Sequence, residues 1–253
     1  MAFNTSKHTL VESEDGSFTA FSSEFQEHYH STRDGALHES LYKHVIPAFK
    51  HHQDKEELYI LDICFGLGFN TLATLYYLRE NNIQKKVRIF SPEFDGDLIK
   101  SLHEFTYPDI FKDFLPIIEV LSHEHMYEDE SLYIELYIGD AREYLSTCSE
   151  RFDIVYQDAF SPTTNPLLWT KEYFEDIARL IKDDGILTTY SMALKTRIAL
   201  YENGFKLYIN SGDGYRDATL ASQSTLNGLK EVDVRHKMMC NPTVYSLRDT
   251  EIV

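Results

Sequence analysis

The sequence predicts an α/β protein built on a mostly parallel β-sheet. Short apolar runs of strand length alternate along the chain with segments of helical periodicity. Four consecutive apolar runs end at or beside an acid, and the first of them leads into a Gly-x-Gly loop. The chain has 253 residues, enough to bury the core of one medium domain with additions.

The first fifty residues form a small extension before the main sheet. An Asp-Gly turn signal and loosely alternating aromatic residues over 15–31 predict a hairpin. Apolar spacing over 36–49 predicts a short helix that ends near Pro47. We therefore divide the chain into an N-terminal hairpin and helix extension (1–50) and a main domain (51–253).

The main domain contains seven predicted strands. The helices between them require a mostly parallel sheet, and only the closing pair is expected to be antiparallel. Residues 107–131, with two prolines and an acidic cluster, predict an insertion with a solvated loop. The predicted strands are 58–64, 87–91, 132–138, 152–158, 186–190, 205–210 and 217–222, and the predicted helices are 70–78, 94–105, 141–148, 170–182 and one that ends at 203.

The loop after the first strand predicts a cofactor pocket. Gly66 and Gly68 allow the backbone to approach a ligand closely and direct the free N–H groups of a helix N-terminus into the same space. Thr71 stands where the dinucleotide fingerprint has its third glycine, and no Gly-Lys-Ser/Thr phosphate loop is present. The loop favours S-adenosylmethionine (SAM) over a dinucleotide, with a merely structural turn as the alternative.

Acids at four strand ends define the expected site, because ligands of such sheets bind beyond the carboxyl ends of the strands. Glu93 is placed to accept hydrogen bonds from ribose hydroxyls, and Asp140 from the adenine amine. Asp62 either pairs with the cationic amino-acid end of SAM or braces the loop from the core. A single acid at such a position would be interpreted as a turn or a helix N-cap, but four at consecutive strand ends favour a site.

Asp158 is the candidate catalytic residue. It ends the fourth strand beside the expected methyl-donor pocket, and it precedes a loop rich in Pro and Asn. Methyl transfer to an amine requires the nitrogen lone pair to be free and aligned, and a fixed carboxylate can accept the N–H and take up the proton. The alternative role for Asp158 is the N-cap of the following segment.

Charge and composition restrict the partners. The formal charge of −17 argues against broad phosphate binding, although residues 191–240 hold seven Lys and Arg against five Asp and Glu. Any RNA contact is therefore expected in this C-terminal quarter. Three scattered cysteines, no signal pattern and no long apolar run predict a cytoplasmic protein without a membrane segment.

Other candidate residues carry two interpretations each. Phe160 and Trp169 either stack on a base or anchor their loop to the core. The pairs His28/His30 and His123/His125 lack a metal-site spacing, so no metal is predicted. Six basic residues form either a phosphate-contacting face or ordinary surface, namely Lys195, Arg197, Arg216, Lys230, Arg235 and Lys237.

Three motifs resemble a known family. DGSFTAFSSEFQEHYHS and the following GALHES resemble its N-terminal segment, DICFGLGFN (62–70) resembles its glycine loop, and DAFSPTTNPLLW (158–169) resembles its substrate loop. The family is the methyltransferase half of the MnmC-type tRNA 5-methylaminomethyl-2-thiouridine biosynthesis proteins, including stand-alone forms. The sequence departs from the pattern at Cys64 and Ala159, which replace glycines, and at Phe69, which replaces leucine.

The resemblance implies a Rossmann-like SAM-dependent methyltransferase fold with a seven-stranded sheet. It implies N-methylation of the 5-aminomethyl group of wobble uridine in tRNA, without the FAD-dependent domain, downstream of separate FAD-dependent or GTPase-complex enzymes. The expected cofactor contacts come from Asp62, Gly66, Gly68, Asn70, Glu93, Asp140 and Asp158, and the expected substrate contacts from Phe160, Asn165, Trp169, Lys195 and Arg216. The alternatives are an aminopropyltransferase-like or other small-amine enzyme and, in another class, a SAM-binding protein without catalysis.

Overall fold

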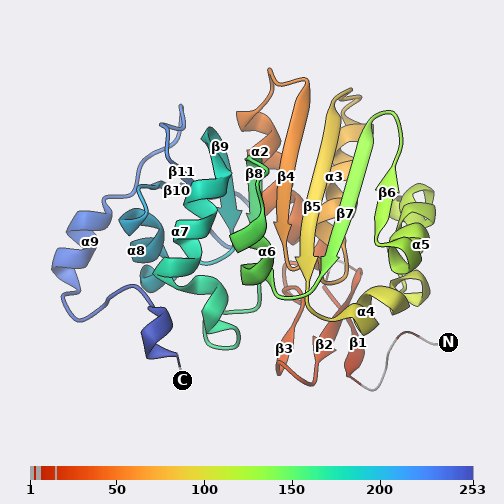
Figure 1. Cartoon of the computed structure of the whole chain (residues 1–253), viewed down its shortest axis with the longest axis horizontal. Coiled ribbons are helices and arrows are strands. Elements are labelled where there is room, and N and C mark those ends of the chain that lie inside the picture. Colours follow the sequence, from red (N-terminus) through yellow and green to blue (C-terminus); the bar gives the residue numbers. More distant parts are fainter. Residues whose placement is uncertain (1–2, 4–6, 15, 253) are drawn as a thin grey trace.

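The central sheet has the predicted, mostly parallel arrangement (Figure 1). The computed structural model describes residues 3, 7–14 and 16–252. Strands β4, β5, β7, β8 and β9 are parallel, whereas β6, β10 and β11 each pair antiparallel, the last two as the predicted closing pair. The sheet order is β10-β11-β9-β8-β4-β5-β7-β6, with bounds β4 (Glu57–Ile63), β5 (Lys86–Glu93), β6 (Met126–Glu128), β7 (Leu132–Ile138), β8 (Phe152–Gln157), β9 (Ile181–Thr189), β10 (Lys206–Asn210) and β11 (Ala218–Ser222).

Helices cover both faces of this sheet, which explains why its strands are apolar on both sides. Along β4, Leu58 and Ile60 belong to one buried cluster, and Leu61 and Ile63 belong to the other. The first cluster includes side chains of α2 (Ile46–His51), α3 (Phe69–Glu80), α4 (Gly96–Ser101) and α5 (Leu115–Glu124). The second includes α6 (Ala141–Thr147), α7 (Lys171–Leu180), α8 (Leu194–Glu202) and the start of α9 (Val234–Cys240).

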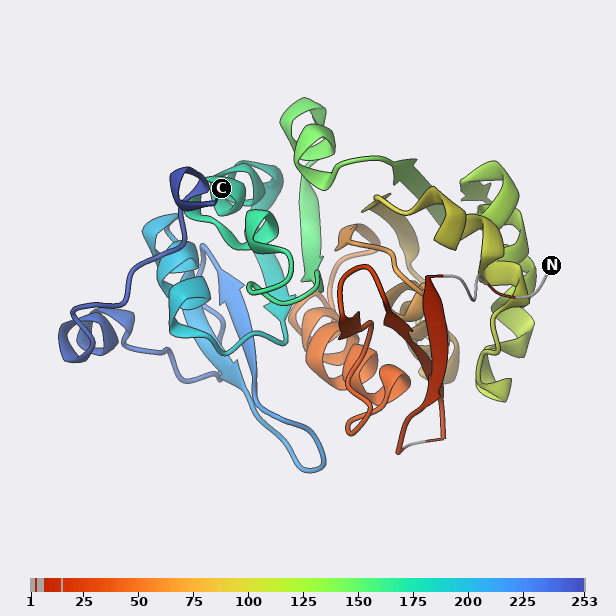
Figure 2. The same ribbon diagram turned by 90° about the horizontal axis from the view of Figure 1, so that it is seen from below.

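A small separate sheet covers the carboxyl ends of the central strands (Figure 2). Its strands are β1 (His8–Glu12), β2 (Phe18–Ser22) and β3 (Glu27–His28), in the order β1-β2-β3. The hairpin of β2 and β3 lies within the predicted range 15–31, whereas β1 was not predicted. Asp15 of the turn signal lies outside the described residues. This extension therefore lies over the edge where the strand-end acids were expected to meet.

The helical part of the extension corrects one prediction. It runs through α1 (Ala36–Glu39), the π-helical turn η1 (Ser40–Val45) and α2 without ending at Pro47. Pro47 lies in the first turn of α2, where a missing backbone N–H is tolerated. The continuous helical segment packs against α3, so the extension shares the core of the main domain.

The expected insertion is more ordered than predicted. Residues 107–131 contain the 3₁₀ turn η3 (Asp109–Phe114), α5 and β6. Pro116 lies in the first turn of α5, so it does not break the helix, and Ile118 and Leu121 are buried. Short 3₁₀ turns also occur at η2 (Leu102–Glu104), η4 (Pro166–Trp169) and η5 (Asp249–Glu251). Within the described residues, no helix combines the length and apolar character needed to cross a membrane.

Candidate functional site

A cavity of about 980 Å³ is lined by residues of the small sheet and by residues at the carboxyl ends of the central strands. Its volume is at the upper end of the range typical of small-molecule sites. Among the described residues, nine carboxylates and five Lys or Arg side chains line it, so the wall is acidic. The lining carboxylates are Glu24, Glu27, Asp34, Glu39, Glu93, Asp95, Asp97, Asp158 and Asp217.

The glycine loop forms one wall of this cavity and depends on left-handed backbone conformations. Gly66 and Gly68 have φ of +54° and +75°. A Cβ would approach the Tyr29 ring to 3.1 Å at Gly66 and the Phe65 ring to 2.9 Å at Gly68. Cys64, which replaces the first glycine of the family pattern, also has a positive φ, +65°. Both glycines are thus required by the backbone, and Cys64 adopts the same region at a steric cost.

Glu93 receives two backbone N–H groups at the end of β5. Its Oε2 accepts from Gly66 N at 2.9 Å and its Oε1 from Asp95 N at 2.8 Å. Burial raises the pKa of Glu93, although these hydrogen bonds favour the carboxylate. The acid therefore ties the glycine loop to the turn after β5, and it lines the cavity as predicted for a ribose-binding residue.

Asn70 connects two of the strand-end acids. Its Nδ2 lies 3.0 Å from Asp158 Oδ2 and 3.3 Å from Asp62 Oδ1, and Thr71 Oγ1 donates to Asp62 Oδ2 at 3.2 Å. Burial, followed by the charge of Asp158, raises the pKa of Asp62 to about 8. Asp62 does not line the cavity, so its position fits a brace of the loop better than a direct cofactor contact.

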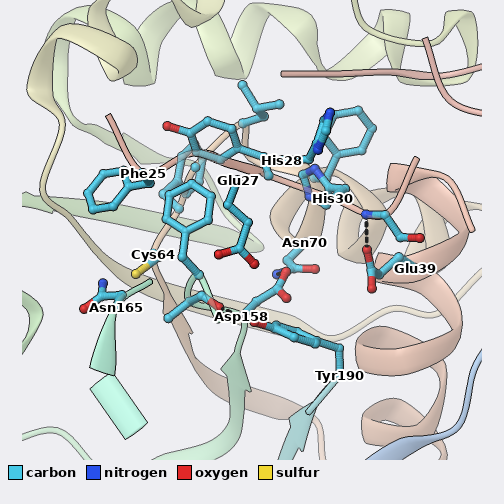
Figure 3. A pocket seen from close by; sticks show the side chains of 18 of the residues that line it. Phe25, Glu27, His28, His30, Glu39, Cys64, Asn70, Asp158, Asn165 and Tyr190 are labelled. Carbon is cyan, nitrogen blue, oxygen red and sulfur yellow. Dashed lines mark hydrogen bonds between the residues drawn. The ribbon is translucent and has the colours of Figure 1, made fainter. Parts of the chain in front are cut away.

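Asp158 lies at the centre of the constellation, immediately after β8. Figure 3 shows Glu27, Asn70 and Asp158 directed toward the same part of the cavity. Asp158 Oδ1 lies 3.5 Å from Nε2 of the buried His44. Burial alone would raise the pKa of Asp158, but the neighbouring His44, His30 and Asn70 lower it below its usual value. The carboxylate is therefore ionised and partly accessible, with one oxygen accepting from Asn70 and the other facing His44.

Asp140 has a different position from its strand-end partners. Its Oδ1 accepts from Arg142 N at 2.7 Å and Glu143 N at 3.3 Å, so it is the N-cap of α6. It is not among the residues that line the cavity. The capping alternative is what the structure shows, and the adenine contact remains a prediction.

Of the three predicted substrate-binding residues on the substrate loop, two line the cavity and one is buried. Phe160 and Asn165 line the cavity. Trp169 is 1% exposed, and its indole N–H donates to the Phe160 carbonyl at 2.7 Å. This corrects the predicted base contact of Trp169, because its buried ring anchors the loop and offers no face for stacking.

The predicted basic residues also differ in their position relative to the cavity. Arg216, in the loop between β10 and β11, lines the cavity, whereas Lys195 is exposed and away from it. Arg197 is only 5% exposed and donates to Thr219 Oγ1 at 3.1 Å, which excludes both the phosphate-contacting and the surface interpretation. Among the residues described, no group of three or more His, Cys, Asp or Glu is placed to hold a metal ion.

Several cavity residues were missed by sequence reasoning. Glu27 accepts from Ser161 Oγ at 3.0 Å and from Ser161 N, so β3 is fastened to the substrate loop. Phe25 stacks on Phe160 with ring centroids 4.8 Å apart, and Tyr29 contacts the same ring. The aromatic and acidic pattern of 15–31 was the available signal, but the pattern did not indicate which side chains would enter the site.

Comparisons with known proteins show which family the chain resembles. Residues 102–224 match the model of a family described as S-adenosyl-L-methionine-dependent methyltransferase. The crystal structure of MnmC2 from Aquifex aeolicus is 32% identical, with a TM-score of 0.85, over 99% of this chain and 82% of that one. An uncharacterized protein of Methanocaldococcus jannaschii is 31% identical over 90% of this chain and 64% of its own.

The bifunctional relatives are longer than this chain. The tRNA 5-methylaminomethyl-2-thiouridine biosynthesis bifunctional protein MnmC of Azoarcus is 29% identical over 81% of this chain. The match covers only 34% of that protein. The fold, the strand-end site and the Aquifex aeolicus structure lead to one conclusion: the chain belongs to the MnmC-type family of SAM-dependent methyltransferases.

Proposed function

We propose that this methyltransferase N-methylates the 5-aminomethyl group of wobble uridine in tRNA and forms 5-methylaminomethyl-2-thiouridine. The observation that carries the proposal is the position of Asp158, an ionised carboxylate at the end of β8 that reaches an acidic cavity. The MnmC relatives, which are named as tRNA 5-methylaminomethyl-2-thiouridine biosynthesis proteins, support the identity of the acceptor. A cytoplasmic location is part of this proposal.

The cavity residues fit SAM, which supplies an activated methyl group on a cationic sulfur. Glu93 would hold the ribose, because each of its oxygens keeps a free lone pair beside its backbone N–H partner. Asn70 Oδ1 is buried without a hydrogen bond and would accept from the cationic amino-acid end. The excess of carboxylates around the cavity favours both a sulfonium and an amine.

Asp158 would orient the acceptor amine and receive its proton. An ammonium group has no lone pair, so only the neutral amine can attack the methyl group. We expect the rate of methyl transfer to fall at acid pH when chemistry limits turnover. A flat rate between about pH 6 and pH 9 would contradict this mechanism.

The tRNA would approach the cavity from the side of the small sheet and the substrate loop. Phe160 and Asn165 would contact the nucleoside, and Arg216 would contact a phosphate. Lys7, Arg33 and Lys100 also line the cavity, although none of them was predicted. The basic residues at the cavity therefore come mostly from outside the C-terminal quarter, where the RNA contact was expected.

Nucleoside mass spectrometry tests the proposal. The purified protein is incubated with SAM and tRNA that carries 5-aminomethyl-2-thiouridine. Gain of one methyl group on that base alone is the expected result. No gain, with SAM binding shown in parallel, would refute the tRNA substrate, and activity with putrescine and decarboxylated SAM would identify an aminopropyltransferase instead.

A further inference from the structure

His44 lies behind the candidate catalytic acid, on the π-helical turn η1. Its side chain is fully buried, and its Nε2 lies 3.5 Å from Asp158 Oδ1. Its Nδ1 lies 2.8 Å from Thr188 Oγ1, and its ring meets the Tyr156 ring edge to face at 5.8 Å. The imidazole orientation is therefore fixed by β8 and β9. Helical turns of π type recur at functional sites.

A neutral imidazole at this position can accept one additional proton. In a neutral imidazole only one nitrogen carries hydrogen. If that nitrogen is Nδ1, it donates to Thr188, and Nε2 faces a carboxylate oxygen that also lacks hydrogen. If it is Nε2, the Thr188 hydroxyl donates to Nδ1 instead. Only in the first tautomer can Nε2, a buried atom without a hydrogen bond in the structure, take a proton from Asp158, and both nitrogens then donate to an oxygen.

Asp158 connects this imidazole to the cavity. One carboxylate oxygen faces His44, the other accepts from Asn70, and the side chain is 10% exposed at the cavity wall. The imidazole behind this carboxylate can take a proton away from the cavity, because its buried Nε2 has no hydrogen bond and faces Asp158 Oδ1.

We propose that His44 stores the proton that the acceptor amine must lose before methyl transfer. The inference rests on the proposed N-methylation of an aminomethyl group. One N–H bond of the substrate ammonium breaks and an O–H bond forms at Asp158; the proton of Asp158 then passes to His44 Nε2. The neutral amine attacks the methyl carbon, a C–N bond forms, and the C–S bond breaks with its electron pair going to sulfur. After product release the proton returns through Asp158 to solvent.

In the part of the chain that the structure describes, the other titratable groups near the pair are Asp62, Tyr156, Tyr190, Lys43 and His30, together with the cavity carboxylates Glu27 and Glu39. Asp62 has a raised pKa, but it faces Asn70 and Thr71 and lies outside the cavity wall. Burial raises the pKa of the phenols of Tyr156 and Tyr190, so both stay neutral. Lys43, on the same turn as His44, is held by Asp34 at 2.8 Å and Glu39 at 2.7 Å. His30 is the other imidazole near Asp158, and its ring packs against Phe69.

Single-turnover methylation of 5-aminomethyl-2-thiouridine tRNA between pH 6 and pH 10 tests this role. His44→Gln should react about 100-fold more slowly than wild type at pH 7. The defect should shrink toward pH 10, where the amine is already neutral in solution. His52→Gln is the matched control, since His52 is also buried but contacts the Asp153 carbonyl outside the cavity; it should keep the wild-type profile. An equal loss at every pH for His44→Gln would overturn the proposal.

A second measurement requires no substrate and so separates this inference from the identity of the acceptor. The ¹⁵N signals of the His44 ring report its imidazolium fraction at pH 6.5 in wild type and in Asp158→Asn. That fraction should fall in the variant, because the carboxylate that stabilises the cation is gone. An unchanged fraction refutes the pairing, even if the tRNA proves to be the wrong substrate or His44→Gln does not fold. If wild type does not methylate this tRNA but the fraction falls, the pairing stands and the proposed substrate fails.

Discussion

Replacing Asp62 by Asn should stabilise the protein at alkaline pH and much less at acid pH. Asp62 is fully buried, and its pKa rises from 3.8 to about 8, first through burial and then through the charge of Asp158. A raised acid pKa means that the folded state holds a proton that the unfolded chain releases above pH 4. Stability is therefore lost as pH rises from 4 to 8.

The magnitude follows from the pKa difference. One pKa unit corresponds to about 1.4 kcal/mol, so the cost attributable to Asp62 grows by about 4 kcal/mol between pH 5 and pH 8. Asn keeps the shape of Asp62 but cannot ionise, and it retains only one of the two acceptor oxygens that receive Asn70 and Thr71. The difference in unfolding free energy between Asp62→Asn and wild type should increase by roughly this amount over that range.

Denaturant unfolding of the SAM-free protein at pH 5, 6.5 and 8 measures this effect. Asp153→Asn is a matched control, because Asp153 is also a buried carboxylate but its pKa is shifted in the opposite direction. Burial acts on Asp153 too, but Lys182 and Lys55 at 2.8 and 2.6 Å lower its pKa, so this variant should lose stability about equally at all three values. A pH-independent difference between Asp62→Asn and wild type would show that Asp62 is ionised throughout and would refute the reasoning.

Three further changes test other parts of the site. Asp158→Asn should abolish methyl transfer while SAM affinity, measured by calorimetry, stays within a few-fold, and retained turnover would remove Asp158 from the mechanism. Glu93→Gln should weaken SAM binding, because the carboxylate that receives Gly66 N and Asp95 N loses one acceptor oxygen; unchanged affinity would contradict the ribose role. Cys64→Gly should raise the free energy of unfolding by roughly 0.5–1 kcal/mol. Glycine removes the steric strain of Cys64 at φ +65°, and this gain outweighs the larger conformational entropy that glycine gives the unfolded chain. A loss of stability would show that Cys64 is not strained.

The sequence was sufficient to predict the parallel sheet, its antiparallel closing pair and the strand-end position of Glu93 and Asp158. These features follow from local patterns, because buried parallel strands are apolar throughout and the chain must turn at their ends. The same local patterns failed at Pro47 and over 107–131. There, prolines in the first turn of a helix looked like breaks.

Only the tertiary structure decided which side chains share the cavity. Glu27 meets Ser161 and His44 meets Asp158 across more than a hundred residues, and no local periodicity records such a contact. Burial likewise decided between the two interpretations of Trp169, whose ring proved to be enclosed by the core. Local patterns thus indicate where a strand ends, whereas tertiary packing determines what a strand-end acid contacts and whether it is charged, as the N-terminal extension does when it brings His44 to Asp158.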